Sequence, residues 1–192
     1  MTDMDLARSR RKLLLIAATA FVPMMIAYGL FFFAPDLIPK TTTNRGELIQ
    51  PSVDVSDRLA TDGRWQLLMP MADTCSQACQ SRLQQVLHQT RQINIALGKN
   101  ADRLGRGLVR ATPLAPADSE VMKTDYPNLT QIVDAQLLAQ LSLLSSTTLA
   151  SEGYSVFLVD PVGQLILAYP AARVDKPLLL DLKHLMKISN IG

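Results

Sequence analysis

An uninterrupted apolar run near the N-terminus is the first feature of the hydrophobic pattern. Residues 13–34 carry no charged side chain over 22 positions. At a helical rise of about 1.5 Å per residue, such a run spans a bilayer core of roughly 30 Å. Pro23 lies in its middle and is expected to kink the helix. The pattern therefore predicts a transmembrane helix at residues 13–34, preceded by a short tail at residues 1–12.

The pattern changes after this run. Residues 35–62 are rich in Pro, Thr, Asn and Asp and are interpreted as a linker. Within it, "GELIQPSVDV" can pair as a short edge strand, because Pro51 is poorly suited to a central strand. Beyond it, residues 63–192 are predicted to form a compact domain. Its expected elements are a buried strand (64–72), a helix (75–97), a second strand (105–113), an amphipathic helix (125–144), a hairpin around "DPVG" (154–170) and a last helix (174–189).

Local signals set the expected ends of these helices. Asp73 or Thr74 is expected to cap the helix at 75–97, and Gly98 to end it. Asp175 is expected to cap the last helix, which has Pro177 at an early position. The order strand, helix, strand, helix, hairpin, helix is that of a thioredoxin core. The predicted fold class is α/β, a thioredoxin-like central sheet with flanking helices, preceded by one transmembrane helix.

Charge predicts the orientation of the anchor. The stretch "ARSRRK" places four basic residues directly before the apolar run, and the positive-inside rule then leaves the N-terminus in the cytoplasm. A cleaved signal peptide is the alternative. It is disfavoured because the run exceeds the usual ~7–15 residues and no A-x-A site follows it. We therefore expect a single-pass protein of the cytoplasmic membrane with its C-terminal domain outside, in the periplasm of a Gram-negative cell.

The charge of the outer portion is balanced. The first 34 residues hold four of the 19 basic and two of the 17 acidic residues, so the remainder holds 15 of each. This balance gives no electrostatic reason to expect nucleic acid as a partner. No glycine-rich phosphate loop, H-E-x-x-H or G-x-S-x-G motif is present in the sequence.

The only two cysteines, Cys75 and Cys79, are expected where the first strand of the domain gives way to its first helix. On the outer side of the membrane a disulfide persists, and thiolates at a helix N-terminus are stabilised. Three readings stay open. The first is a soft-metal site, in which Met69 and Met71 are either further sulfur ligands or core residues. The second is thiol–disulfide exchange. The third is a structural bridge in an interaction module.

These residues resemble the Sco/SenC group of membrane-anchored thioredoxin-like proteins, which assist copper insertion into cytochrome c oxidase. The resemblance rests on "TCSQAC" after an apolar strand, on the hairpin "LVDPVGQLILAYP" and on the basic C-terminal helix, and it covers roughly residues 40–190. The stretches "TTTNRGELIQP" and "TRQINIALGKNADRLGRGLV" are similar to a divergent bacterial branch. The resemblance implies an accessory role in oxidase biogenesis, with an oxidase subunit or another assembly factor as partner.

The sequence departs from that family at the metal site. The family has a histidine before the first hairpin strand, which completes a copper site of two cysteines and one histidine. Glu152 stands near that position here, and a carboxylate is a hard ligand that suits Cu(I) poorly. Neither His88, about 20 Å along the helix from Cys75, nor His184 is expected to replace it. No cofactor is certain from the sequence; if copper is a cargo, its expected ligands are Cys75 and Cys79, with Glu152 near the position of the absent histidine.

The enzyme reading is weakened by two further departures. Thioredoxin-like oxidoreductases usually carry C-x-x-C, whereas the spacing here has one more residue. They also have a cis-proline before the third strand, where Gly153 stands in this chain. We therefore expect a copper or thiol chaperone or scaffold rather than an enzyme. If the chain is an enzyme, the resemblance implies a thiol–disulfide oxidoreductase that uses Cys75 and Cys79.

Overall fold

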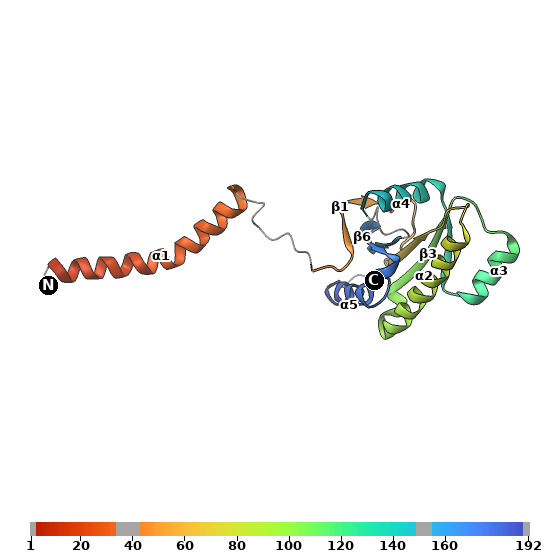
Figure 1. Cartoon of the computed structure of the whole chain (residues 1–192). Coiled ribbons are helices and arrows are strands. Elements are labelled where there is room, and N and C mark those ends of the chain that lie inside the picture. Colours follow the sequence, from red (N-terminus) through yellow and green to blue (C-terminus); the bar gives the residue numbers. More distant parts are fainter. Residues whose placement is uncertain (1–2, 34–42, 149–154, 190–192) are drawn as a thin grey trace. The chain divides into compact units, whose positions relative to one another are not determined.

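The chain divides into two units, Met1–Thr43 and Asn44–Gly192, in a computed structural model that describes residues 3–33, 43–148 and 155–189. The first unit contains one long helix, α1 (Asp3–Phe33), which bends along its length (Figure 1). Its segment Arg10–Phe33 is the one helix within the described ranges that is long and apolar enough to cross a membrane. α1 begins ten residues before the predicted span, and Pro23 lies inside it.

The second unit is built on a six-stranded mixed sheet with the strand order β1-β6-β5-β2-β3-β4. Strands β2, β3 and β4 are parallel neighbours, whereas β5, β6 and β1 are added in antiparallel pairs. The strands are β1 (Glu47–Asp54), β2 (Trp65–Pro70), β3 (Leu104–Arg110), β4 (Leu129–Val133), β5 (Ser155–Val159) and β6 (Gln164–Pro170).

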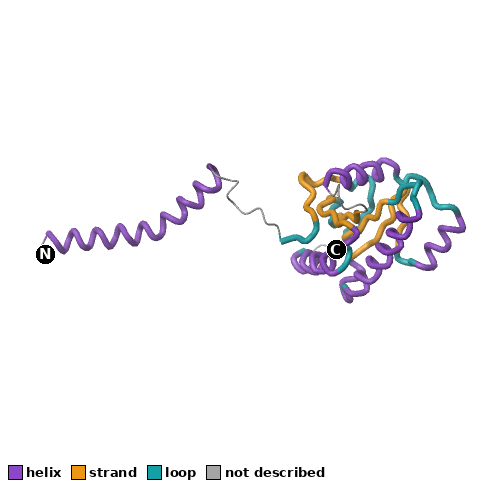
Figure 2. The backbone as a smooth tube through the Cα atoms, viewed as in Figure 1, coloured by secondary structure: helices purple, strands orange, loops and turns teal. Residues whose placement is uncertain are grey.

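Helices cover both faces of this sheet (Figures 1 and 2). Core residues of α2 and α5 pack against one face with the side chains of Leu67 and Met69, and partly buried residues of α3 join them. Helix α4 packs against the other face, where Leu68 points. The helices are α2 (Gln77–Ala96), α3 (Pro116–Asp125), α4 (Ala135–Thr148) and α5 (Lys176–Ile188), with short 3₁₀ turns at Gly98–Arg103 and Ala171–Arg173.

This architecture confirms the predicted thioredoxin-like fold. The buried strand, the second strand, the hairpin and the last helix all form where the pattern placed them. The expected edge strand forms as β1 and pairs with β6, so the second unit begins within the stretch that was interpreted as linker.

The helix predicted at residues 125–144 is confirmed from Ala135 onward and is wrong over the residues before it. Residues Leu129–Val133 form β4, which pairs in parallel with β3, and α4 begins only at Ala135. The leucine and isoleucine spacing fits both structures locally, and pairing with β3 decides between them. Asp134 marks the boundary, because its Oδ1 accepts hydrogen bonds from the backbone N–H groups of Gln136 and Leu137 at 2.9 Å.

One predicted cap is wrong, and another is confirmed in position only. Ser76, rather than Asp73 or Thr74, is the N-cap of α2. Asp175 occupies the N-cap position of α5 without a side-chain capping bond. Helix α3, which starts with Pro116 in its first turn, was not predicted. Gly98 does end α2, in the left-handed region with φ of 57°.

Candidate functional site

Cys75 and Cys79 are joined by a disulfide at the point where β2 leads into α2. Their Cα atoms lie 5.4 Å apart, and both residues are half-buried. Cys75 precedes the N-cap Ser76, and Cys79 lies in the first turn of α2. The Ser76 Oγ accepts a hydrogen bond from the Cys79 backbone N–H at 3.3 Å. The bridge is therefore partly open to solvent and anchored by the helix start.

The buried strand β2 fixes where this turn lies. The side chains of Leu67 and Met69 are fully buried toward α2, and Leu68 is fully buried toward α4. Because β2 and β3 are parallel, their carboxyl ends meet at one edge of the sheet. The backbone N–H of Met71 extends this pairing by donating to the Val109 carbonyl at 2.8 Å. The chain then turns toward Cys75 beside the end of β3.

Arg110, the last residue of β3, ties this turn to the sheet. Its side chain is only 11% exposed. Its Nη1 donates to the Met71 sulfur at 3.3 Å, and its Nη2 donates to the Asp73 carboxylate at 3.2 Å. Its Nε donates to the Thr112 carbonyl at 3.1 Å. Sequence reasoning did not find Arg110, because only the parallel pairing of β2 with β3 brings it to the cysteine turn.

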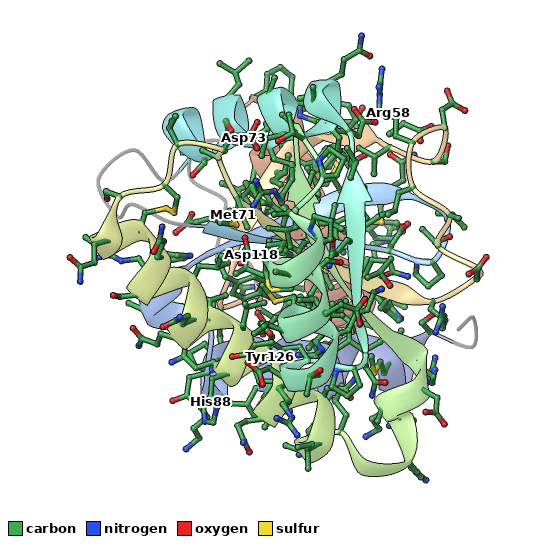
Figure 3. All side chains as sticks on the ribbon, turned by 90° about the vertical axis from the view of Figure 1, so that its right-hand side faces the viewer. Arg58, Met71, Asp73, His88, Asp118 and Tyr126 are labelled. Carbon is green, nitrogen blue, oxygen red and sulfur yellow. A yellow bond between two sulfur atoms is a disulfide. The ribbon has the colours of Figure 1, made fainter. Side chains whose placement is uncertain are left out.

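A groove with a volume of about 580 Å³ lies between α2 and α3, beside this turn. Figure 3 shows Met71, Asp73, Asp118 and Tyr126 along it, with Met71 and Asp73 toward one end and Tyr126 toward the other. Gln80, the residue that follows Cys79, also lines it. The groove combines apolar side chains with the carboxylates of Asp73, Asp118 and Asp125.

The other candidate ligands lie away from the cysteines. His88 is exposed on α2 and lines a separate hollow of about 370 Å³ with Arg91 and Tyr126, and His184 is exposed on α5. Glu152 and Gly153 lie outside the described residues. Among the residues that are described, no group of three or more His, Cys, Asp and Glu side chains could hold a metal ion.

The two methionines have different surroundings. Met69 is fully buried in the core, and its sulfur accepts a hydrogen bond from the Thr90 hydroxyl at 3.7 Å. Met71 is partly buried at the groove, with its sulfur against the Arg110 guanidinium. Met69 is therefore a core residue, and Met71 is the thioether nearer to the surface.

Fold and site together define a thioredoxin-like domain with a C-x-x-x-C disulfide at the start of its first long helix. The family model "Transmembrane-like, thioredoxin-like, C-terminal domain" matches residues 65–189. The chain belongs to this family. No curated protein matches it.

Several solved structures are similar in fold at low sequence identity. BsSco, a member of the Sco family of cytochrome c oxidase assembly proteins, is 12% identical over 78% of this chain and 99% of its own, with a TM-score of 0.48. Bradyrhizobium japonicum ScoI with copper bound is 17% identical over 72% and 98%, with a TM-score of 0.44. A thiol:disulfide interchange protein from Bacteroides sp. is 12% identical over 78% and 95%, with a TM-score of 0.43.

Proposed function

We propose that this chain is a membrane-anchored accessory protein that exchanges thiols and disulfides through Cys75 and Cys79 on the outer side of the membrane. The observation that carries the proposal is the half-buried bridge at the start of α2. A bridge that closes a five-residue loop stabilises a fold by only about 2 kcal/mol in the chain-entropy model, so it is a weak staple. Its exposure and its place at a helix N-terminus suit chemistry instead.

The exchange would proceed in two steps. A thiolate of a dithiol partner attacks one sulfur of the Cys75–Cys79 bridge; a mixed disulfide forms, and the other cysteine leaves as a thiolate. The second partner thiolate then attacks the mixed disulfide, so that the partner is oxidised to a disulfide and the pair is reduced to two thiols. The groove between α2 and α3 is lined by Asp73 and Gln80, which precede and follow the cysteine turn in the chain, and would offer the partner a surface near it.

The process that we propose is cytochrome c oxidase biogenesis. It follows from the resemblance of the "TCSQAC" turn and the "LVDPVGQLILAYP" hairpin to the Sco/SenC group. The partner would then be an oxidase subunit or another assembly factor. The apolar segment Arg10–Phe33 would hold the domain at the membrane, with the basic residues before it in the cytoplasm.

The reduction potential of the pair tests the thiol proposal. The full chain in detergent is equilibrated with glutathione buffers, and the reduced fraction is read by thiol alkylation and mass shift. We expect a potential between about −120 and −270 mV, the range of thiol–disulfide oxidoreductases. A potential below about −300 mV, typical of structural disulfides, would contradict exchange and leave an interaction module. In the Cys75→Ser variant only the Cys79 thiol can be alkylated, so its mass shift identifies the modification at Cys79.

Copper delivery is a second candidate, favoured because reduction of the bridge leaves two soft sulfur ligands side by side. The residues that the structure describes supply no third ligand of the expected kind, and Arg110 places a positive charge against the Met71 sulfur. A Cu(I) titration of the reduced chain against a competing chelator decides the matter. One equivalent that Cys75→Ser loses would support copper handling, whereas no competition with the chelator would remove it.

A further inference from the structure

Arg106 is a buried cation near the amino end of β3, which lies between β2 and the edge strand β4. It lies in β3, opposite Leu67 of β2 and Leu129 of β4, and is 3% exposed. Its Nε and Nη1 atoms are buried and have no hydrogen-bond partner among the described residues. An ionised group in this position is costly unless it is paired, because desolvation removes its water without replacement.

The described surroundings of Arg106 do not supply a counter-charge. Burial lowers the pKa of Arg106, and the nearby Arg91 guanidinium lowers it further, whereas Tyr126 acts weakly in the opposite direction. No described carboxylate forms an ion pair with Arg106: the six ion pairs of the described ranges involve other arginines or a lysine. A guanidinium is not neutralised by losing its proton at physiological pH, so its charge persists.

A polar pocket opens beside this side chain. It has a volume of about 300 Å³ and lies at the amino ends of the parallel strands β2, β3 and β4. Arg64, Asn94, Arg106, Asn128 and Thr130 line it, together with the exposed carboxylate of Asp102. The cysteine turn follows the opposite, carboxyl end of β2, so the pocket is separate from the disulfide site.

We propose that this pocket binds a small oxyanion, a carboxylate or a phosphate, through the guanidinium of Arg106. A guanidinium N–H donates charge-assisted hydrogen bonds to both groups. The size of the pocket, at the lower end of the usual range for ligand sites, suits a small molecule. Arg64 also lines the pocket, is 46% exposed and adds a second positive charge, which it shares with the exposed Asp62 at 3.5 Å. The carboxylate of Asp102 also lines the pocket and disfavours larger polyanions.

Titration of the full chain in detergent tests this proposal, with inorganic phosphate in one arm and acetate in the other. We expect one of the two to bind and to raise the unfolding temperature as its concentration passes the Kd. Arg106→Met should weaken binding by at least about tenfold, because each charge-assisted hydrogen bond contributes more than a neutral one. Arg64→Gln should weaken it by a smaller factor while leaving the buried core unchanged.

Arg82→Met is the matched control. Arg82 is exposed on α2 and does not line the pocket, and its substitution removes the same charge. Binding that persists in Arg82→Met and falls in Arg106→Met and Arg64→Gln supports the proposal. Three outcomes would overturn it: an equal loss of binding in all the variants, the same effect from chloride at matched ionic strength, or no binding of either anion at tens of millimolar. If Arg106→Met does not fold, weaker anion binding in Arg64→Gln than in Arg82→Met still supports the pocket as the binding site, and equal binding in the two contradicts it.

Discussion

The guanidinium of Arg110 lies 3.3 Å from the sulfur of Met71, across the carboxyl ends of two parallel strands. The same guanidinium holds Asp73 at 3.2 Å, two residues before Cys75. The segment that enters the disulfide is thus fixed by one side chain from the neighbouring strand. The Met71 sulfur already accepts a hydrogen bond from this positively charged group, which disfavours it as a ligand for a copper cation.

Replacing Arg110 by glutamine should loosen the segment from Met71 to Cys75. The variant loses the charge-assisted bond to Asp73 and weakens the contact with Met71, and we expect a loss of about 1–2 kcal/mol in the free energy of unfolding. Hydrogen exchange of the amides at residues 72–75 should become faster, while exchange in α4 should not change. Arg82→Gln is the control. Unchanged exchange at 72–75 would mean that the disulfide alone holds this segment.

A buried carboxylate joins the beginning of the second unit to its last helix. Asp181 of α5 is 4% exposed and accepts hydrogen bonds from the backbone N–H groups of Arg45 at 2.7 Å and Gly46 at 3.1 Å. It also accepts from the Tyr169 hydroxyl at 2.9 Å, and the Arg45 Nη1 pairs with its other oxygen at 3.1 Å. One side chain therefore accepts hydrogen bonds from two distant parts of the chain, the segment Arg45–Gly46 and the end of β6.

Asp181→Asn should destabilise the domain by about 2–4 kcal/mol, because an amide turns one acceptor toward donors that then stay unpaired in the interior. The measurement is urea unfolding followed by the fluorescence of Trp65. Asp175→Asn is the matched control, since Asp175 is exposed at the start of the same helix and makes no side-chain capping bond. Equal losses in the two variants would assign no special role to Asp181.

Alkaline pH should destabilise the domain through Tyr169. Burial raises the pKa of Tyr169, and the neighbouring Asp181 carboxylate raises it further. A folded-state pKa above the unfolded value of about 10 means that this contribution to stability is complete below pH 10 and is lost as the pH rises above it. Unfolding free energies at pH 8–12 should fall more steeply for the native chain than for Tyr169→Phe, by up to about 1.4 kcal/mol per pH unit.

Tyr126→Phe is the control for that comparison, because it removes the hydroxyl of a different tyrosine, a half-buried one that lines the groove between α2 and α3. The comparison of the two variants separates the loss of the contact with Asp181 from the loss of a tyrosine hydroxyl elsewhere in the domain. Parallel curves for the native chain and Tyr169→Phe would contradict the role assigned to Tyr169.

Local patterns predicted the elements whose signals lie within one short stretch. The hairpin follows from two β-rich runs around "DPVG", and β2 follows from its continuous apolar run. By contrast, residues 129–133 have an apolar spacing that fits a helix, and only the pairing with β3, more than twenty residues earlier, makes them a strand. Asp134, followed by a leucine-rich run, was a capping signal that marked the true start of α4.

The candidate site shows the same limit. The two cysteines were visible as a pair in the sequence, and the structure joins them in a disulfide. Arg110 and Arg106 appear in the sequence as two ordinary basic residues of an expected strand. Their importance comes from burial and from neighbours on β2, β4 and the helices, which one-dimensional spacing does not contain. Charged residues in a central strand were nevertheless a signal, since arginine is seldom fully buried without a partner.

The stability that the disulfide contributes is linked to its chemistry. In the chain-entropy model the Cys75–Cys79 loop adds about 2 kcal/mol, and by linkage the folded domain favours the bridge over the dithiol by the same amount. For a two-electron couple, about 1.4 kcal/mol corresponds to 30 mV, so folding should lower the reduction potential by only about 40 mV. Such a bridge stays within reach of biological thiols.

Urea unfolding of the full chain with and without reductant should therefore differ by about 2 kcal/mol or less, and Cys75→Ser/Cys79→Ser should match the reduced chain. The matched control is reductant added to this double variant, which should change nothing. A difference of 4–5 kcal/mol would identify a structural staple and argue against exchange. A reduced form that is the more stable would mean that the fold favours the dithiol and would make the oxidised pair a strong oxidant of its partner.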